Sequence, residues 1–457
     1  MMNPDLPTSP EELLLWERER GIEQLVGMGA LSYRLPKRLN GRLRARPEDF
    51  IVSEVTRDGS VATTVTYSSR EEATHPIYIM TKVNSDTLAA MRQLSSAIGL
   101  KPWEMDRLGL KDKRAQTFQF VSPKKRCETP PKLRGSEWGA DLMAISSTPL
   151  RPCDLRGNLF WVTIRLRAPM LVDEIRDVLG HFSSKVAETG LLNFFGYQRF
   201  GGRKPVNHIA GYLIAKRDYE AACKVILCTP SRTEPRELTN VRSRLLERRN
   251  REDLARVARS PLSVERALAR NFMRYECDAR KSILHLPANL LRFLLEAFSS
   301  FLFNDTIGAM SGQLLSGGIR EGALYSQLDN EGGVLTTYAM GAPWNRRRIG
   351  EDLRLRRAVP AVACPGFLAE RAIEGKTRET MAQLGIDCSS FHFQERPEAG
   401  YPGQVRAAVV FPRLISAAPI DARAVFLSFF LPRSSYATVL LRELLSQRTT
   451  RRGVTEP

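Results

Sequence analysis

The stretch RGNLFWVTIRLR, residues 156–167, alternates apolar and polar side chains and predicts a β-strand buried on one face. Its even-numbered positions from Phe160 to Leu166 are apolar, whereas its odd-numbered positions carry Trp161, Thr163 and two arginines. Successive side chains of a strand point to opposite faces of a sheet, so one face of this strand can pack on a core. The stretch therefore predicts a domain built around a sheet.

Patterns on both sides of this strand predict a mixture of strands and helices. Alternation indicates strands, and apolar residues at three- and four-residue steps indicate helices. The expected strands are residues 42–65 (a hairpin or meander), 117–121, 405–411 and 425–431, and the expected helices are a short one after Pro10 and residues 85–98, 171–189 and 439–445. Residues 124–138 are polar and are expected to form a loop. The pattern of residue types along the chain differs between residues 211 and 396, and we interpret this part as an inserted module.

The chain is long, basic and rich enough in apolar residues to bury a core. Its 457 residues correspond to about three domains, or to one large unit with an insertion. Lys and Arg total 68 against 50 for Asp and Glu, a formal net charge of +18 that favours a polyanionic partner such as RNA or DNA. An arginine-rich composition fits a GC-rich genome equally well, so charge alone leaves nucleic-acid binding open.

Cysteine and histidine usage predicts reduced thiols and no metal centre. The seven cysteines are scattered without a C-x-x-C pair, and the five histidines lie far from them and from one another in the sequence. We find no signal-peptide pattern and no apolar run of membrane-spanning length, so we expect a cytoplasmic protein. Motifs of phosphate-cradling loops, zinc proteases and serine hydrolases are missing too, which leaves a reaction without a cofactor, or plain binding.

Asp112 is the leading candidate for chemistry. It lies in GLKDKRAQTFQ, residues 109–119, between Lys111 and Lys113 and in an expected turn between two extended segments. Neighbouring cations favour the ionised carboxylate, which can act as a nucleophile or base toward a nucleotide. The other interpretation is an ordinary turn aspartate in a solvated charge cluster.

Two further segments combine aromatic, polar and cationic residues in the way that nucleic-acid sites do. NFFGYQRFGG, residues 193–202, mixes rings that can stack on bases with cations that can pair with phosphates. Two tight turns anchored by core phenylalanines would give the same composition. At the start of the central strand, Asn158 can hydrogen-bond a base edge while Phe160 offers a ring face.

Taken in order, these segments resemble the TruD family of tRNA pseudouridine synthases, particularly its archaeal and eukaryotic branch. The motifs that carry the resemblance are RPEDFIVSEV (46–55), GLKDKRAQTFQ (109–119), RGNLFWVTIR (156–165), NFFGYQRFGG (193–202) followed by Asn207 and His208, and LPRSSYATVLLREL (431–444). FSSFLFND (298–305) is similar to part of the family's inserted domain. Two positions depart from the family pattern: Phe194, where Tyr is more usual, and Ser434, where Gly is usual.

The resemblance implies an α+β fold, in which a pseudouridine-synthase catalytic domain with a curved, mostly antiparallel sheet is interrupted by an inserted α/β domain. The expected parts are an amino-terminal extension (1–35), the first part of the catalytic domain (36–210), the inserted domain (211–396), the second part of the catalytic domain (397–450) and a tail (451–457). The resemblance also implies that tRNA lies in a basic cleft between the two domains.

The activity implied by the resemblance is the isomerisation of a uridine of tRNA, at a U13-type site, to pseudouridine without a cofactor. Asp112 would attack C1′ or C6 of the nucleotide, which has to leave its stack to be reached. Asn158 would orient the base, and Phe160 and Phe429 would place rings against it. Phe429 fits a core residue of the last strand equally well.

Four further residues are expected near the base or the RNA: Lys111, Arg199, Asn193 and Glu54. For Glu54, a carboxylate satisfied by a neighbouring turn is the simpler explanation. We expect a monomer without a protein partner. The main alternative is a protein of the same fold that binds or folds RNA without isomerase activity, and the intact Asp112 argues against it. Another base-flipping RNA enzyme, such as a methyltransferase, would need a cofactor loop that the sequence does not show.

Overall fold

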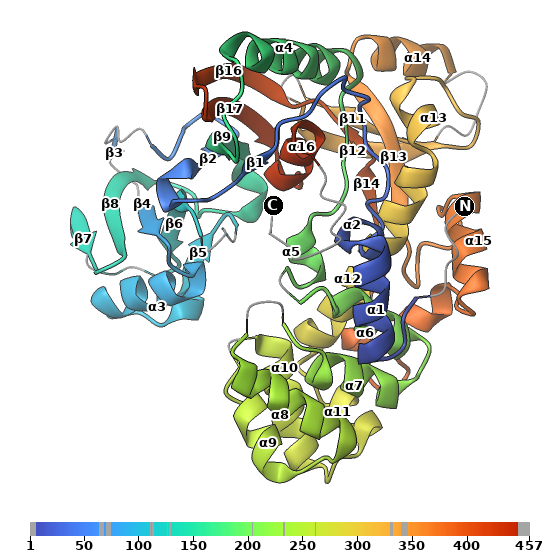
Figure 1. Cartoon of the computed structure of the whole chain (residues 1–457). Coiled ribbons are helices and arrows are strands. Elements are labelled where there is room, and N and C mark those ends of the chain that lie inside the picture. Colours follow the sequence, from blue (N-terminus) through green and yellow to red (C-terminus); the bar gives the residue numbers. More distant parts are fainter. Residues whose placement is uncertain are drawn as a thin grey trace.

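The computed structural model describes residues 6–446 apart from 64–67, 70–74, 110, 112–113, 126, 128, 203, 232–233, 261, 330–331 and 340–345. Figure 1 shows a large sheet on one side of the molecule, a second sheet on the other side and a group of helices below them. The long helix α12 (Ala288–Ala309) runs between the helices and the second sheet.

Among the described residues, eleven strands form the large sheet, in the order β16-β17-β9-β2-β6-β4-β8-β3, with β1, β5 and β7 pairing with β9, β6 and β8. Their bounds are β1 Gly41–Arg42, β2 Phe50–Thr56, β3 Ser68–Ser69, β4 His75–Val83, β5 Met105–Arg107, β6 Gln116–Pro123, β7 Lys132–Arg134, β8 Trp138–Ser146, β9 Leu155–Leu166, β16 Arg413–Asp421 and β17 Ala424–Pro432. The pairs β2–β6 and β3–β8 are parallel, and the other described pairs of this sheet are antiparallel. The predicted α+β class with a mostly antiparallel sheet is therefore confirmed.

Strand β9, which contains the stretch quoted first, lies between β2 and β17. In its register Asn158 pairs with Glu54 of β2, and Phe160 pairs with Phe429 of β17. The residue before Asn158 is a glycine because β17 approaches closely, since a Cβ atom on Gly157 would lie 2.2 Å from a backbone oxygen of β17. Residues distant in the sequence thus meet at one end of three adjacent strands.

The second sheet has the strand order β12-β11-β13-β14 among the described residues. Its strands are β11 Leu324–Leu328, β12 Val334–Ala339, β13 Ala358–Cys364 and β14 Gln404–Ala407. The chain then forms β15 (Val409–Val410), which pairs with β10 (Leu191–Leu192). The predicted inserted domain spans residues 211–396, and β14, which follows that range, still pairs within the second sheet. The division of the chain into domains stays a prediction.

The helices fall into groups that cover the sheets or form the lower part of the molecule (Figure 1). Their bounds are α1 Pro10–Arg20, α2 Ile22–Leu25, α3 Thr87–Ala97, α4 Val172–Thr189, α5 Tyr197–Phe200, α6 Asn207–Ala215, α7 Tyr219–Cys228, α8 Arg236–Glu247, α9 Arg251–Val257, α10 Ser263–Arg274, α11 Ala279–Leu284, α13 Ser311–Leu315, α14 Arg346–Arg354, α15 Gly375–Gln383 and α16 Ala437–Leu444. Helix α4 packs on β16 of the large sheet. Within the described residues no helix is both long and apolar enough to cross a membrane.

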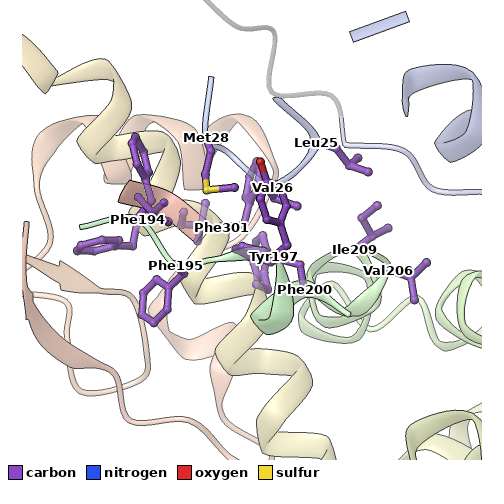
Figure 2. Packing of buried hydrophobic residues seen from close by; sticks show 14 of the residues in the cluster. Leu25, Val26, Met28, Phe194, Phe195, Tyr197, Phe200, Val206, Ile209 and Phe301 are labelled. Atoms are coloured by element: carbon purple, nitrogen blue, oxygen red, sulfur yellow. The ribbon is translucent and has the colours of Figure 1, made fainter. Parts of the chain in front are cut away.

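The buried side chain of Asn304 joins α12 to two distant segments. Its Nδ2 donates to the carbonyl oxygens of Val26 at 2.9 Å and of Phe195 at 3.1 Å, and its Oδ1 accepts from the Phe195 N–H at 2.8 Å. Around this polar clamp the rings of Phe194 and Phe200 pack among apolar residues of the amino-terminal segment and of α12 (Figure 2). The segment NFFGYQRFGG is therefore held between the amino-terminal segment and α12.

Most of the strongly periodic elements are confirmed by α3, α4, α16, β2, β6, β9 and β17. The predicted single strand at residues 405–411 is wrong, because the chain changes partners at Ala408 and forms β14 in one sheet and β15 in another. The predicted loop at residues 124–138 contains the short strand β7. Within the hairpin or meander predicted at residues 42–65, the structure shows β2 and an isolated bridge between Val55 and Val61, and residues 64–65 lie outside the described residues.

Candidate active site

A buried polar contact joins the ends of β2 and β9 to the loop before β6. Lys111 Nζ lies 2.8 Å from Glu54 Oε1 and donates to Asn158 Oδ1 at 2.7 Å. The second oxygen of Glu54 accepts from the backbone N–H of Phe120 at 2.8 Å. Glu54 is fully buried, and the Lys111 side chain is only 8% exposed. Three of the predicted site residues thus form one hydrogen-bonded group.

Two buried side chains hold the loop that carries Lys111 through hydrogen bonds to its backbone. Thr87, the first residue of α3, accepts from the Lys111 N–H at 3.3 Å and donates to the Lys111 carbonyl oxygen at 3.2 Å. Gln119 of β6 donates to the carbonyl oxygen of Gly109 at 3.2 Å. The backbone is therefore held at Gly109 and at Lys111, just before Asp112. Asp112 itself lies outside the described residues, and its role stays a prediction.

Beside this group lies an open pocket of about 200 Å³. It is lined by Phe50, Val52, Lys111, Asn158, Phe160, Gln198, Ser435, Tyr436, Ala437 and Thr438. We call it the base pocket. Its walls come from β2, β9, the loop before β6, α5 and the turn into α16.

The ring of Phe160 forms an aromatic wall of the base pocket, and other aromatic rings pack against it and support it. Its ring stacks on that of Phe429 with the centroids 5.1 Å apart and an angle of 19° between the planes, and it meets the edge of Phe50 at 6.0 Å. Phe429 is fully buried and does not line the pocket. It occupies the core position that was its alternative interpretation, and it supports the ring of Phe160.

Two hydroxyl groups in the wall of the base pocket have no hydrogen-bond partner among the described residues. Ser435 Oγ and Thr438 Oγ1 are both buried. Buried polar atoms are nearly always satisfied in folded proteins, so these two hydroxyls are unusual. The preceding residue, Ser434, has φ of 65°, a left-handed conformation that favours glycine, so the turn keeps the shape expected for the family's usual residue.

The structure places Asn193 and Arg199 away from the base pocket, against a larger cavity of about 450 Å³. Asn193 Nδ2 donates to the carbonyl oxygen of Ala407 at 2.9 Å, and its Oδ1 accepts from Arg406 at 3.0 Å. Arg199 forms an ion pair with Glu296 at 3.0 Å. Asn193, which follows β10, therefore ties the start of this segment to β14 of the second sheet.

In the same segment the rings of Phe194, Phe195 and Phe200 are at most 1% exposed. The interpretation that these rings stack on bases is wrong, because they anchor the segment in the core (Figure 2). The residue of this motif that reaches the base pocket is Gln198.

Several residues of the site have no individual prediction from the sequence. Gln198, Ser435, Tyr436 and Thr438 stand inside quoted motifs, so the motifs were the available signal, although nothing in them marked these positions. Thr87 gave no signal, since threonine is ordinary at the start of a helix. Among the described residues, no group of three or more His, Cys, Asp and Glu side chains is arranged to hold a metal ion.

Comparison with known proteins first defines the class of fold. A crystal structure described as the putative tRNA pseudouridine synthase D (TruD) from Methanosarcina mazei superimposes with a TM-score of 0.72 and 26% identity, covering 92% of this chain and 97% of that chain. Proteins described as probable tRNA pseudouridine synthase D are similar in sequence. The protein from Pyrobaculum islandicum is 30% identical and covers 89% of this chain and 92% of its own length, and that from Pyrococcus abyssi is 29% identical with 89% and 96% covered.

A family model described as tRNA pseudouridine synthase D (TruD) matches residues 26–444. The chain belongs to the TruD family. The predicted family is thereby confirmed, and with it the predicted enzyme class, because pseudouridine synthases are isomerases that act on RNA.

Proposed function

We propose that this protein is a tRNA pseudouridine synthase that converts one uridine of tRNA, at a U13-type site, to pseudouridine. The observation that carries the proposal is the base pocket, which combines a braced aromatic wall with the buried group of Lys111, Glu54 and Asn158. Lys111 lines this pocket and immediately precedes Asp112 in the chain.

In the proposed reaction the Asp112 carboxylate is the nucleophile toward C1′ or C6 of the flipped uridine. On either route the N1–C1′ bond breaks, the uracil turns, the C5–C1′ bond forms, C5 loses its proton and N1 gains one. Atoms and electrons balance without an oxidant or reductant, so the residues of the site have to bind, orient and move protons. A carboxylate nucleophile that forms a transient covalent bond divides one difficult step into two easier ones.

The hydrogen bond from Lys111 sets the orientation of the Asn158 side-chain amide. Its Oδ1 accepts from Lys111, which has only donors, so the amide Nδ2 is the atom left to face the pocket. That amide can donate to a carbonyl oxygen of uracil. Phe160, held by Phe429, supplies a ring face, and base–aromatic stacking contributes about 1 to 3 kcal/mol toward the cost of unstacking.

The hydroxyls of Ser435 and Thr438 supply further recognition groups. A hydroxyl both donates and accepts, so the pair could bind the N3–H and a carbonyl of a uracil edge once their side chains turn toward the pocket, because both oxygens are buried in this structure. Discrimination of this kind is strong, because a base lacking the matching groups leaves buried polar atoms unpaired.

The decisive test is Asp112→Asn, which keeps the size of the side chain and removes its charge. With RNA tritiated at uridine C5, we expect tritium release to stop while RNA affinity changes by less than about tenfold. Asp177→Asn, on the exposed face of α4, is the matched control and should keep full turnover. Turnover retained by Asp112→Asn would refute the nucleophile.

If the wild-type protein binds tRNA but forms no pseudouridine, the alternative of a non-catalytic RNA-binding protein on this fold is favoured instead. Mapping pseudouridine after incubation with total RNA also identifies the position that is modified. A monomeric state and a cytoplasmic location stay predictions.

A further inference from the structure

The larger cavity, which we call the second cavity, is positively charged. Its described lining residues are Leu108, Pro152, Leu155, Asn193, Phe195, Arg199, Leu328, Gly332, Val334, Gln404, Val405, Arg406, Ala407, Val410, Pro432, Arg433, Ser434 and Tyr436. These include three arginines and no aspartate or glutamate. Concave surfaces lined by one sign of charge concentrate ligands of the other sign.

Arg406 is the most unusual of the three arginines, because it is buried without a carboxylate. Its guanidinium donates to the backbone oxygen of Asn193 at 3.1 Å and to its Oδ1 at 3.0 Å, and lies 4.0 Å from the centre of the Phe195 ring. No acidic side chain in the described part of the chain pairs with it, and it is only 8% exposed. Buried charges normally have an ionic partner, so the cavity beside Arg406 invites an anion.

The second cavity and the base pocket share a wall. Tyr436 lines both, and its ring packs on Gly196, where a Cβ atom would lie 2.7 Å from Cδ1 of the ring. On each side of Tyr436 neighbouring residues divide between the two spaces: Gln198 and Ser435 line the base pocket, whereas Arg199 and Ser434 line the second cavity. The base pocket and the second cavity are therefore adjacent, and one RNA strand could enter both of them.

Resting on the proposed function, we propose that the second cavity is a nucleotide subsite, which takes the nucleotide next to the target uridine with its phosphate among Arg199, Arg406 and Arg433. The volume of about 450 Å³ is more than twice that of the base pocket, which suits a phosphate with part of its nucleoside. Tyr436 then separates the two nucleotides and keeps them unstacked.

The subsite gives the second sheet a part in substrate binding. Leu328 of β11 and Val334 of β12 contribute apolar lining, and Arg433, the residue after β17, contributes a charge. The RNA would bridge the two sheets at this point, and the phosphate would supply the counter-charge that Arg406 lacks.

Arg433→Gln tests the proposal, because this arginine is partly exposed and can be changed without opening the core. The matched control is Arg423→Gln, at the opposite end of β17 about 30 Å away, where the side chain is exposed. The substrate is a tRNA fragment containing the mapped uridine. Each phosphate within two nucleotides of it is replaced, one at a time, by a neutral methylphosphonate.

For the wild type and Arg423→Gln we expect one methylphosphonate position that lowers kcat/KM by about tenfold to a hundredfold, the effect of one charge-assisted contact. In Arg433→Gln the same replacement should cost at least about threefold less than in the wild type, because the phosphate has already lost one of its three arginine contacts. If every position stays as costly in Arg433→Gln as in the wild type, the subsite does not exist. Saturable binding of free uridine monophosphate that Arg433→Gln abolishes, together with a flat phosphate scan, would identify a mononucleotide site and also overturn the proposal.

A binding measurement separates this proposal from the proposed activity. The logarithm of tRNA affinity should fall with the logarithm of salt concentration, and Arg433→Gln should reduce that slope by about 0.7, the value for one single-stranded phosphate. Arg423→Gln should leave the slope unchanged. Loss of the slope difference rejects the subsite even when pseudouridine forms, whereas a normal slope difference without any pseudouridine rejects the activity and keeps the subsite.

Discussion

Replacing Glu54 by glutamine should damage the site far more than the change of one atom implies. Both oxygens of Glu54 accept hydrogen bonds or ionic contacts, one from Lys111 at 2.8 Å and the other from the Phe120 N–H at 2.8 Å. Glutamine has a single acceptor oxygen. In either orientation its NH₂ group must face a donor, and Lys111 is left buried without a negative partner.

The expected cost follows from burial. Glu54 is fully buried and the Lys111 side chain is 8% exposed where it lines the base pocket, so water solvates little of either charge. Breaking a buried ion pair from one side costs about 3 to 5 kcal/mol. With a urea dependence of about 2 kcal/mol per molar, the unfolding midpoint of Glu54→Gln should fall by about 1.5 to 2.5 M. We expect pseudouridine formation to fall at least about a hundredfold, since Asn158 loses a fixed orientation.

Tryptophan fluorescence during urea unfolding reports on the stability of the large sheet, which contains Glu54. Its probes Trp103, Trp138 and Trp161 lie within or beside that sheet. The double variant Glu54→Gln/Lys111→Met removes both charges and should be more stable than Glu54→Gln by at least about 1.5 kcal/mol, without regaining activity. A Glu54→Gln protein as stable as the wild type, or a double variant whose loss equals the sum of the two single losses, would refute the buried pair.

Two further predictions concern the framework. Gly157→Ala should destabilise the protein by at least about 2 kcal/mol and prevent turnover, since its Cβ would lie 2.2 Å from a backbone oxygen of β17; thermal unfolding should show no such loss for Gly180→Ala, where nothing lies within 4 Å. Burial lowers the pKa of His208 to about 3, so the unfolded chain binds a proton below about pH 6.5 that the folded protein does not, and stability should fall by about 1.4 kcal/mol per pH unit from there toward pH 3. Urea midpoints at pH 7 and pH 5 should show a smaller difference for His208→Gln than for the wild type, and equal differences would contradict the assignment.

The parts of the fold that the sequence predicts are those whose pattern is local. Strand β9 and helix α4 each place apolar residues on one face with a clear period. Strand β16 gives no such signal, because it lies at the edge of the sheet, its side chains are mostly exposed and it contains Pro419. The change of partner at Ala408 is invisible in the sequence, since both halves of the segment look like one apolar strand.

The same distinction holds for the site. Lys111, Asn158 and Phe160 come together as the motifs predict, because they sit on strands or on a loop whose register is fixed by the sheet. The sequence does not show whether Gln198 or Arg199 lines the base pocket. They are consecutive residues of the short helix α5, and successive helical side chains point in directions about 100° apart, so only the packing around α5 decides which one meets which space.

This packing explains why one motif serves two cavities. Asn193 at its start is fixed to Arg406 and Ala407 of the second sheet, whereas Gln198 near its end lines a pocket whose other walls belong to the large sheet, the loop before β6 and the turn into α16. A displacement of β14 would therefore move Arg199 and Gln198 together. None of the described residues that line the base pocket belongs to the second sheet. On the proposed function, the second sheet therefore sets the position of the arginines that would hold the RNA strand, and the large sheet supplies most of the pocket that would hold the uracil.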